Sequence, residues 1–240
     1  MAETGHAKNV ANLESMMSFC TGYGGDYKPS NPVIELVQLN AALASGQAML
    51  DGVTTGLIGW KGKVNFRENQ YLGVGKLATR VSAAFAICGT TTNAIADMQG
   101  FVRKIAGARK KKLEIDDPNT AINEAAHNSV SQRSYTQSAE HFDAMIEMCM
   151  SEPLYNPNET DLSVATMQAK SAAMKTANTG VTDSVTTLSN NRISRNNVLY
   201  TDPTSIFELA KLVKLYVKSI YGQTSPQFKQ ISGLEFTKPR

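Results

Sequence analysis

Two stretches of this sequence resemble each other, and together they indicate how the chain is built. Residues 52–69 read GVTTGLIGWKGKVNFREN, and residues 180–197 read GVTDSVTTLSNNRISRNN. Both begin with Gly-Val-Thr, and both end with an Arg that is followed two positions later by an Asn. The residue numbers of the two stretches differ by a constant offset of 128 (180 − 52 = 128). If that offset persists over a longer region, it is the sign of an internal repeat.

The correspondence extends on both sides of these stretches. At the same offset, Tyr27 matches Tyr155 and Pro29 matches Pro157. Upstream the offset becomes 129 and downstream it becomes 133, and the matched pairs there include Cys20 with Cys149, Ile87 with Ile220, Gly89 with Gly222, and Gly100 with Gly233. The sequence therefore predicts a tandem duplication with pseudo-twofold architecture. The alternative is a chance similarity between two helical stretches that are rich in small residues.

The duplication divides the chain into three parts. Residues 12–105 form the first helical repeat, residues 106–140 the connector, and residues 141–235 the second helical repeat. The connector begins with basic residues, turns acidic, breaks at Pro118 and ends in a polar stretch. The final GLEFTKP is expected to be an extended tail.

Apolar periodicity predicts that the repeats are helical. In residues 206–220, apolar side chains recur at spacings of three and four, and Lys side chains take the opposite face. Ser205 and Glu208 have the spacing of a capping box, and Gly222 is placed to end the helix. Residues 33–58 and 161–188 also read as helices whose small side chains let neighbouring helices approach closely. The predicted fold class is all-α, a duplicated helical-bundle unit.

Composition favours a folded protein in a reducing compartment. Hydrophobic residues make up 42% of the 240 residues, which is enough to bury a core and excludes a disordered tail. Three Cys cannot all pair within one chain, and no C-x-x-C occurs, so we expect reduced, buried thiols. The N-terminus lacks the pattern of a secretory signal, and we expect a cytoplasmic location, with export by a signal-less route as the alternative.

No complete catalytic or metal-binding motif occurs in the sequence. It contains neither G-x-S-x-G nor a P-loop, so we expect no enzymatic activity and no cofactor. Glu124 and His127 form a single E-x-x-H, whereas a di-iron bundle needs two such motifs and two further carboxylates. The basic cluster that starts at Arg103 is followed at once by acidic residues and has no aromatic platform, which argues against a nucleic-acid partner.

Arg67 with Asn69, and Arg195 with Asn197, are the candidate binding residues because they recur in both repeats. A guanidinium group makes bidentate hydrogen bonds, and Asn tolerates turn conformations. The four residues are expected to bind a shared ligand or a neighbouring subunit. The alternative is a helix corner in which each Arg hydrogen-bonds exposed helix carbonyls.

These observations favour a non-enzymatic structural or interaction protein that self-associates into a homo-oligomer. A tandem repeat presents two related surfaces, which can meet head to tail in rings, stacks or filaments. The first alternative is a membrane-active helical protein, such as a subunit of a pore-forming toxin. The second is a ferritin-like metal-binding bundle, which would hold iron or manganese.

Overall fold

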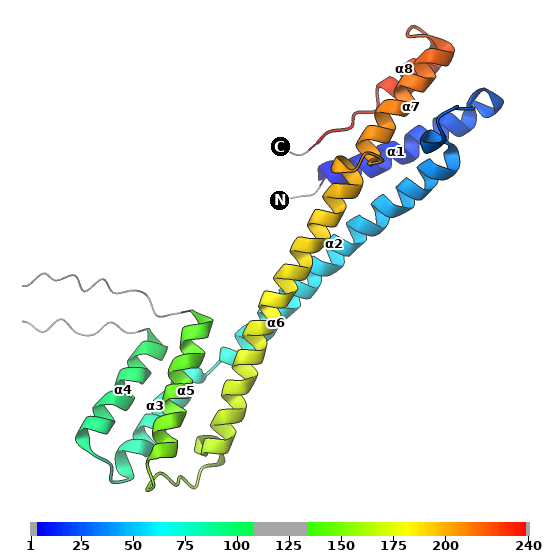
Figure 1. Cartoon of the computed structure of the whole chain (residues 1–240). Helices are drawn as coiled ribbons and strands as arrows, with labels where there is room; N and C mark the ends of the chain where they lie inside the picture. Colours follow the sequence, from blue (N-terminus) through cyan, green and yellow to red (C-terminus); the bar gives the residue numbers. More distant parts are fainter. Residues whose placement is uncertain (1–3, 108–133, 239–240) are drawn as a thin grey trace, which may run out of the picture. The chain divides into compact units, whose positions relative to one another are not determined.

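The computed structural model describes residues 4–107 and 134–238, and these residues are almost entirely helical. The described ranges contain no β-strand, which confirms the all-α fold class. Figure 1 shows the helices in chain order.

The N-terminal half of the chain, residues 4–107, contains four α-helices and two short 3₁₀ turns. They are α1 (Thr4–Gly22), η1 (Gly24–Asp26), η2 (Pro32–Ile34), α2 (Leu36–Tyr71), α3 (Val74–Ile87) and α4 (Thr92–Ala106). α2 is longer than the predicted 33–58, because its interior glycines are tolerated and the chain turns only at Gly73, whose φ is 79°.

The C-terminal half, residues 134–238, follows a similar order of elements. They are α5 (Tyr135–Ser151), η3 (Thr160–Leu162), α6 (Val164–Asn196), the π-helical segment η4 (Asn197–Thr201), α7 (Ile206–Tyr221) and α8 (Pro226–Ser232). α7 coincides with the predicted helix 206–220, and Gly222 ends it with a φ of 84°. No regular secondary structure follows α8 in the described residues, but Thr237 N–H donates to Asn9 Oδ1, which ties the tail to α1.

The predicted capping box at the start of α7 does not form. Ser205 occupies the N-cap position with extended backbone angles, but its side chain accepts no capping hydrogen bond. The Ser205 hydroxyl is instead buried without a partner among the described residues. Glu208 pairs with Lys211 and Lys238, because those ammonium groups lie within 3.0 and 3.5 Å of its carboxylate.

The chain forms two compact units, and each takes elements from both halves. Unit 1 comprises residues 1–61 and 183–240, and unit 2 comprises residues 62–182. The long helices α2 and α6 each contribute to both units. The predicted repeats 12–105 and 141–235 thus divide the chain differently from its compact units, and their status as repeats stays a prediction.

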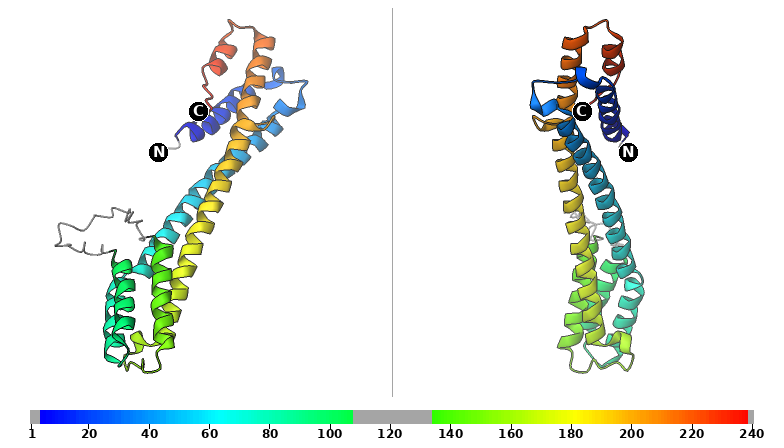
Figure 2. Two further views of the ribbon diagram at one scale, coloured as in Figure 1. Left: turned by 60° about the vertical axis from the view of Figure 1, so that its left-hand side comes forward. Right: turned by 90° about the vertical axis from the view of Figure 1, so that its right-hand side faces the viewer.

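The core of unit 1 combines α1 and the start of α2 with elements from the end of the chain. α7 packs against α1 and α8 (Figure 2). Its buried side chains are mostly aliphatic; from the N-terminal half they include Val10, Leu13, Met16, Leu39 and Leu43, and from the C-terminal half Leu199, Ile206, Leu209, Val213, Val217 and Ile231. Neither half alone supplies this core.

The core of unit 2 combines the end of the N-terminal half with the start of the C-terminal half. α3 and α4 from the N-terminal half pack with α5 and the start of α6 from the C-terminal half. Its buried side chains are rich in Met and Phe: Phe85 and Met98 from the N-terminal half, and Phe142, Met145, Met167 and Met174 from the C-terminal half. Each unit therefore depends on both halves of the chain.

A buried tyrosine holds the turn before each long helix in the same way. Tyr27 Oη donates to the carbonyl of Ile34, at 2.7 Å, ahead of α2. Tyr155 Oη donates to the carbonyl of Leu162, at 2.9 Å, ahead of α6. The donors and the acceptors are both related by the offset of 128, so corresponding positions make the same contact in the two units (155 − 27 = 162 − 34 = 128).

Candidate binding sites

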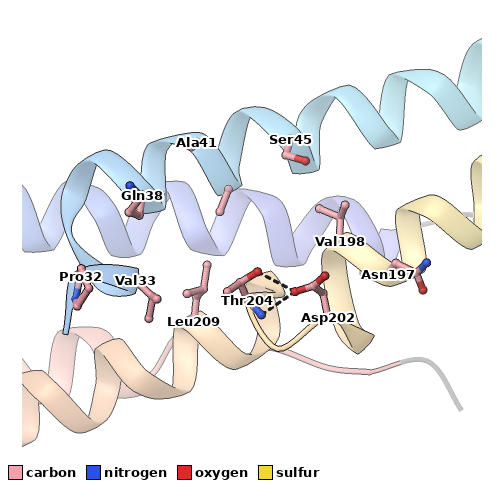
Figure 3. A pocket seen from close by; sticks show the side chains of 11 residues that line it. Pro32, Val33, Gln38, Ala41, Ser45, Asn197, Val198, Asp202, Thr204 and Leu209 are labelled. Carbon is pink, nitrogen blue, oxygen red and sulfur yellow. Dashed lines mark hydrogen bonds between the residues drawn. The ribbon is translucent and has the colours of Figure 1, made fainter.

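A cavity of about 480 Å³ opens in unit 1 where the starts of α2 and α7 meet η2 and η4 (Figure 3). Cavities of this size suit small ligands. Apolar and polar side chains share its wall: Pro32, Val33, Ala41, Ala42, Val198 and Leu209, with Gln38, Ser45, Asn197, Asp202 and Thr204.

Asp202 is the sole ionisable side chain among the residues that line this cavity. Its Oδ1 accepts from the Thr204 amide at 2.8 Å and from the Thr204 hydroxyl at 2.7 Å, as the dashed lines in Figure 3 show. These hydrogen bonds hold the pKa of Asp202 below its usual range, so the carboxylate is ionised at neutral pH. The cavity therefore has a negative polar end.

The π-helical segment η4 forms part of the same wall. Asn197 and Val198 line the cavity, whereas Leu199 and Tyr200 are buried in the core. Asn197 Oδ1 accepts from the Thr201 hydroxyl at 2.8 Å. Single π-helical turns are frequent at functional sites, and this one, at the end of α6, presents Asn197, a predicted site residue, to the cavity.

Tyr200 joins η4 to α1 through a buried polar cluster in unit 1. Its hydroxyl lies 2.6 Å from His6 Nδ1 and 3.2 Å from Asn9 Nδ2. Asn9 Nδ2 also donates to the Thr237 carbonyl at 2.8 Å. Burial raises the pKa of Tyr200, which therefore stays protonated at neutral pH.

Arg195, a predicted site residue, lies beside this cluster and is 5% exposed. Its Nε and Nη2 donate to Asn196 Oδ1 at 3.2 and 3.0 Å. The charge also acts on Tyr200, whose pKa it lowers against the larger effect of burial. Arg195 thus has hydrogen-bonding partners within unit 1.

Arg67, the counterpart of Arg195 at the offset of 128, has a different environment in unit 2. The guanidinium carbon lies 4.0 Å from the ring centroid of Tyr135, the first residue of α5. This distance is typical of a cation–π contact. Arg67 Nε is buried and has no hydrogen-bond partner in the described part of the chain.

Tyr71 fixes the position of Tyr135 beneath that guanidinium. Tyr71 Oη donates to the Tyr135 carbonyl at 2.7 Å and accepts from Asn178 Nδ2 at 2.7 Å. The two tyrosine rings meet edge to face, with centroids 4.8 Å apart. Asn178 Oδ1 is a second buried atom without a partner among the described residues.

The structure separates the predicted Arg–Asn pairs. Asn69 is exposed and lies two positions after Arg67, so the two side chains point to different sides of α2. Asn197 lines the cavity, whereas Arg195 bonds the neighbouring Asn196. The corner alternative would give Arg67 a helix carbonyl as its acceptor, and its Nε has none within the described ranges.

Sequence reasoning missed Tyr135, which contacts Arg67, and the pair of His6 and Tyr200 near Arg195. The offset of 129 that relates Cys20 to Cys149 also relates His6 to Tyr135 and Tyr71 to Tyr200. That common offset was the available signal. It was hard to use because His and Tyr differ chemically and because Tyr71 ends an α-helix while Tyr200 lies in a π-helical segment.

The buried thiols are placed for packing. Cys20 and Cys149 are buried, and burial raises the pKa of each thiol to about 11. Since the thiolate is the nucleophile, such thiols are unreactive at neutral pH. This agrees with the expectation that both cysteines are packing residues.

In residues 4–107 and 134–238, no group of three or more His, Cys, Asp or Glu side chains is arranged to hold a metal ion. Glu124 and His127, the single E-x-x-H, lie outside the described residues. The ferritin-like alternative therefore stays a prediction.

None of the described helices combines the length and the apolar character that a membrane span requires. The cytoplasmic location and the membrane-active alternative stay predictions. Comparisons with protein-family models, curated proteins and solved structures found no match to this chain.

Proposed function

We propose that this chain is a non-enzymatic structural or interaction protein that self-associates through one end of unit 2. The observation that carries the proposal is a group of exposed apolar side chains there, Ile87, Met150 and Leu154, which we call the end patch. These side chains are 86%, 51% and 61% exposed. Exposed apolar groups that cluster mark interaction surfaces more often than single ones do.

The end patch lies where two connections come together. Ile87 ends α3, and Leu154 follows α5. A side chain at Gly89 would lie 3.5 Å from Leu154 Cδ1, so the turn after α3 is in contact with Leu154. Figure 1 shows the α3–α4 and α5–α6 connections at the same end of unit 2.

The corresponding corner of unit 1 is more polar, although Ile87 matches Ile220 there, which is 38% exposed. The offset of 129 relates Met150 to Thr21, and the offset of 128 relates Leu154 to Asp26. Tyr221 Oη lies 3.2 Å from Asp26 Oδ2. We therefore propose that the end patch meets the same patch of a second chain, in a twofold contact.

We also propose that the two halves of the chain arose by tandem duplication with pseudo-twofold architecture. The similar order of elements, the matching Tyr27 and Tyr155 hydrogen bonds and the two buried cysteines support this proposal. The duplication supplies two related units, and of the two only unit 2 carries the end patch. Self-association through a single unit gives a closed dimer rather than a filament.

Light scattering after size exclusion tests this function. We expect a concentration-dependent species of about 52 kDa, twice the 26.0 kDa of one chain. Leu154→Ser should return the protein to the monomer mass, because it replaces an apolar contact with a hydroxyl. A wild-type protein that remains monomeric at about 0.5 mM, a concentration above the dissociation constants of most specific homodimers, would overturn the proposal.

Leu215→Ser is the matched control. Leu215 is 63% exposed on α7 of unit 1, so this variant removes a similar exposed side chain away from the end patch. We expect its mass to equal that of the wild type. Equal loss of the dimer in both variants would show that the contact is not specific to the end patch.

A further inference from the structure

Arg67 carries a charge whose hydrogen-bonding groups are incompletely used in unit 2. Its Nε is buried without an acceptor, and no ion pair to Arg67 occurs in the described part of the chain. Buried polar groups in proteins are nearly always hydrogen-bonded, and a charged donor is the most expensive to leave unpaired. The missing acceptor calls for an explanation.

Stacking on Tyr135 does not supply that acceptor. The ring lies against the face of the guanidinium, whereas the N–H groups point outward in the guanidinium plane. Stacking therefore fixes the orientation of the guanidinium and leaves its N–H groups available to an oxygen ligand. Arg uses this arrangement to bind carboxylate and phosphate groups.

Neighbouring acidic side chains are already occupied or exposed. Asp143, on α5, pairs with Lys175 and accepts from the Ser171 hydroxyl. Glu68, next to Arg67 in the chain, is exposed. In unit 1 the residue at that position is Asn196, which does accept from Arg195. Unit 2 lacks this internal acceptor.

The surroundings of Arg67 favour an anion that also carries a proton. Tyr135 is the first residue of α5, a 17-residue helix whose N-terminus adds positive partial charge. Asn178 Oδ1 is buried without a donor among the described residues, and its amide nitrogen is held by Tyr71. Arg67 stacks on the Tyr135 ring and Asn178 donates to the hydroxyl of Tyr71, whose ring packs against Tyr135. The two residues are therefore linked through one tyrosine pair, and Arg67 needs an acceptor while Asn178 needs a donor.

We propose that Arg67, Tyr135 and Asn178 form a binding site for a hydrogen-bearing oxyanion, namely hydrogen phosphate or the singly protonated form of a phosphate monoester. The phosphate oxygens accept from the Arg67 guanidinium, and the phosphate O–H donates to Asn178 Oδ1. Sulfate satisfies Arg67 but has no proton for Asn178 at neutral pH. The site therefore discriminates between two oxyanions of similar size.

Isothermal titration calorimetry of the full chain, at constant ionic strength, tests this site. Inorganic phosphate should bind with one saturable site per chain and at least tenfold more tightly than sulfate. Glycerol 3-phosphate distinguishes a phosphate ester from free phosphate as the natural ligand. If the ligand is an ester, glycerol 3-phosphate should bind more tightly than inorganic phosphate. If the ligand is the free ion, inorganic phosphate should bind more tightly. A wild-type protein without saturable phosphate binding would overturn the proposal, as would equal binding of phosphate and sulfate.

Variants assign the binding to Arg67. Arg67→Gln should weaken phosphate binding at least tenfold, and Asn178→Leu should remove the preference over sulfate. Arg192→Gln removes the same charge at an exposed position in unit 1 and should bind phosphate within twofold of the wild type. If Arg67→Gln bound phosphate as tightly as the wild type, the proposed site would be wrong.

NMR of the wild-type protein gives a readout that does not depend on the folding of a variant. The buried Arg67 Nε–H should give a resolved signal that shifts on phosphate addition and follows the calorimetric saturation curve. An Arg67 Nε–H signal that stays fixed while phosphate binds elsewhere would contradict the assignment.

Discussion

Units 1 and 2 are both built from helices but fill their cores with different side chains. The core of unit 1 is dominated by Leu, Val and Ile, whereas that of unit 2 holds two Phe and four Met. Met is flexible and adapts to irregular gaps, and branched aliphatic residues have fewer conformations to choose from. Two helical units of the same chain therefore use two different packing solutions.

One pair of positions shows how the two solutions differ in detail. Gly46 in α2 and Met174 in α6 are related by the offset of 128, and both are buried. A side chain at Gly46 would approach Ile206 Cδ1 to 2.6 Å and Val10 Cγ2 to 3.2 Å. In unit 1 the neighbouring residues therefore fill the space that the Met174 side chain itself fills in unit 2.

The largest expected effects come from truncating the cores at corresponding positions. Leu13 and Phe142 are related by the offset of 129, and both side chains are 0% exposed. Leu13→Ala should lower the free energy of unfolding by about 2–5 kcal/mol, and Phe142→Ala by about 3–5 kcal/mol, because each leaves a cavity. Urea denaturation followed by far-UV circular dichroism measures both values.

A surface truncation is the control for this pair. Val37 is 74% exposed, so Val37→Ala should change stability by no more than about 0.5 kcal/mol. If Phe142→Ala were no more destabilising than Val37→Ala, the Met-rich core of unit 2 would be able to collapse around the lost ring. That outcome would show that the two packing solutions also differ in their tolerance of cavities.

The pattern of the sequence was sufficient to predict the helices but not the units they form. Apolar spacing placed α7 correctly, because its stripe of buried residues is continuous. The same reasoning shortened α2 and α6, since glycines and hydroxyl residues conceal their length. Each unit combines helices from both halves of the chain, and this combination depends on long-range packing. A periodic pattern contains no information about such packing.

The candidate site could be predicted only in part. Arg67 and Arg195 stood out because they recur, and the structure gives each a distinct set of contacts. Tyr135 and Asn178 were not predictable as parts of this site, because Tyr135 meets Arg67 and Asn178 meets Tyr71 only through the packing of three helices. The cavity was missed because small residues of α2 and a π-helical turn create it, and neither leaves a motif.

Intermediate effects should come from the two matching tyrosines. Tyr27→Phe and Tyr155→Phe each leave a backbone carbonyl without its buried donor, and each should lower the free energy of unfolding by about 1–2 kcal/mol. The proposed duplication predicts that the two losses agree within about 0.5 kcal/mol, the margin within which effects at independent sites usually add. Thermal and urea unfolding measure both.

Tyr216→Phe is the control for the tyrosines. The Tyr216 hydroxyl accepts from the exposed Lys28 amide at 3.0 Å, where water can replace it. This variant should be less destabilising than either buried substitution. A large loss for Tyr27→Phe alone would show that the turn before α2 carries more of the stability than its counterpart before α6.

The smallest expected effect concerns an ion pair in unit 2 that has no equivalent at the matching position of unit 1. Asp161 in η3 corresponds to Val33 in η2, which lines the cavity of unit 1 (161 − 33 = 128). In unit 2 Asp161 pairs instead with Arg80 of α3, and both side chains are 52% exposed. Exposed ion pairs contribute little, because water and salt compete with them.

This ion pair gives unit 2 a pH dependence that Val33 cannot give unit 1. The hydrogen bond from Arg80 holds the pKa of Asp161 below its usual range, so the pair adds stability above the usual carboxyl pKa of about 3.9. That stability is lost as the pH falls through the lowered pKa of the folded state, because protonation removes the charge.

Asp161→Asn should therefore lower the melting temperature slightly at pH 7 and leave it unchanged once the wild-type carboxyl is protonated. About 1 M NaCl should shrink the difference at pH 7 by screening. A difference that persisted in acid would mean that Asp161 stabilises η3 through its shape and not through its charge.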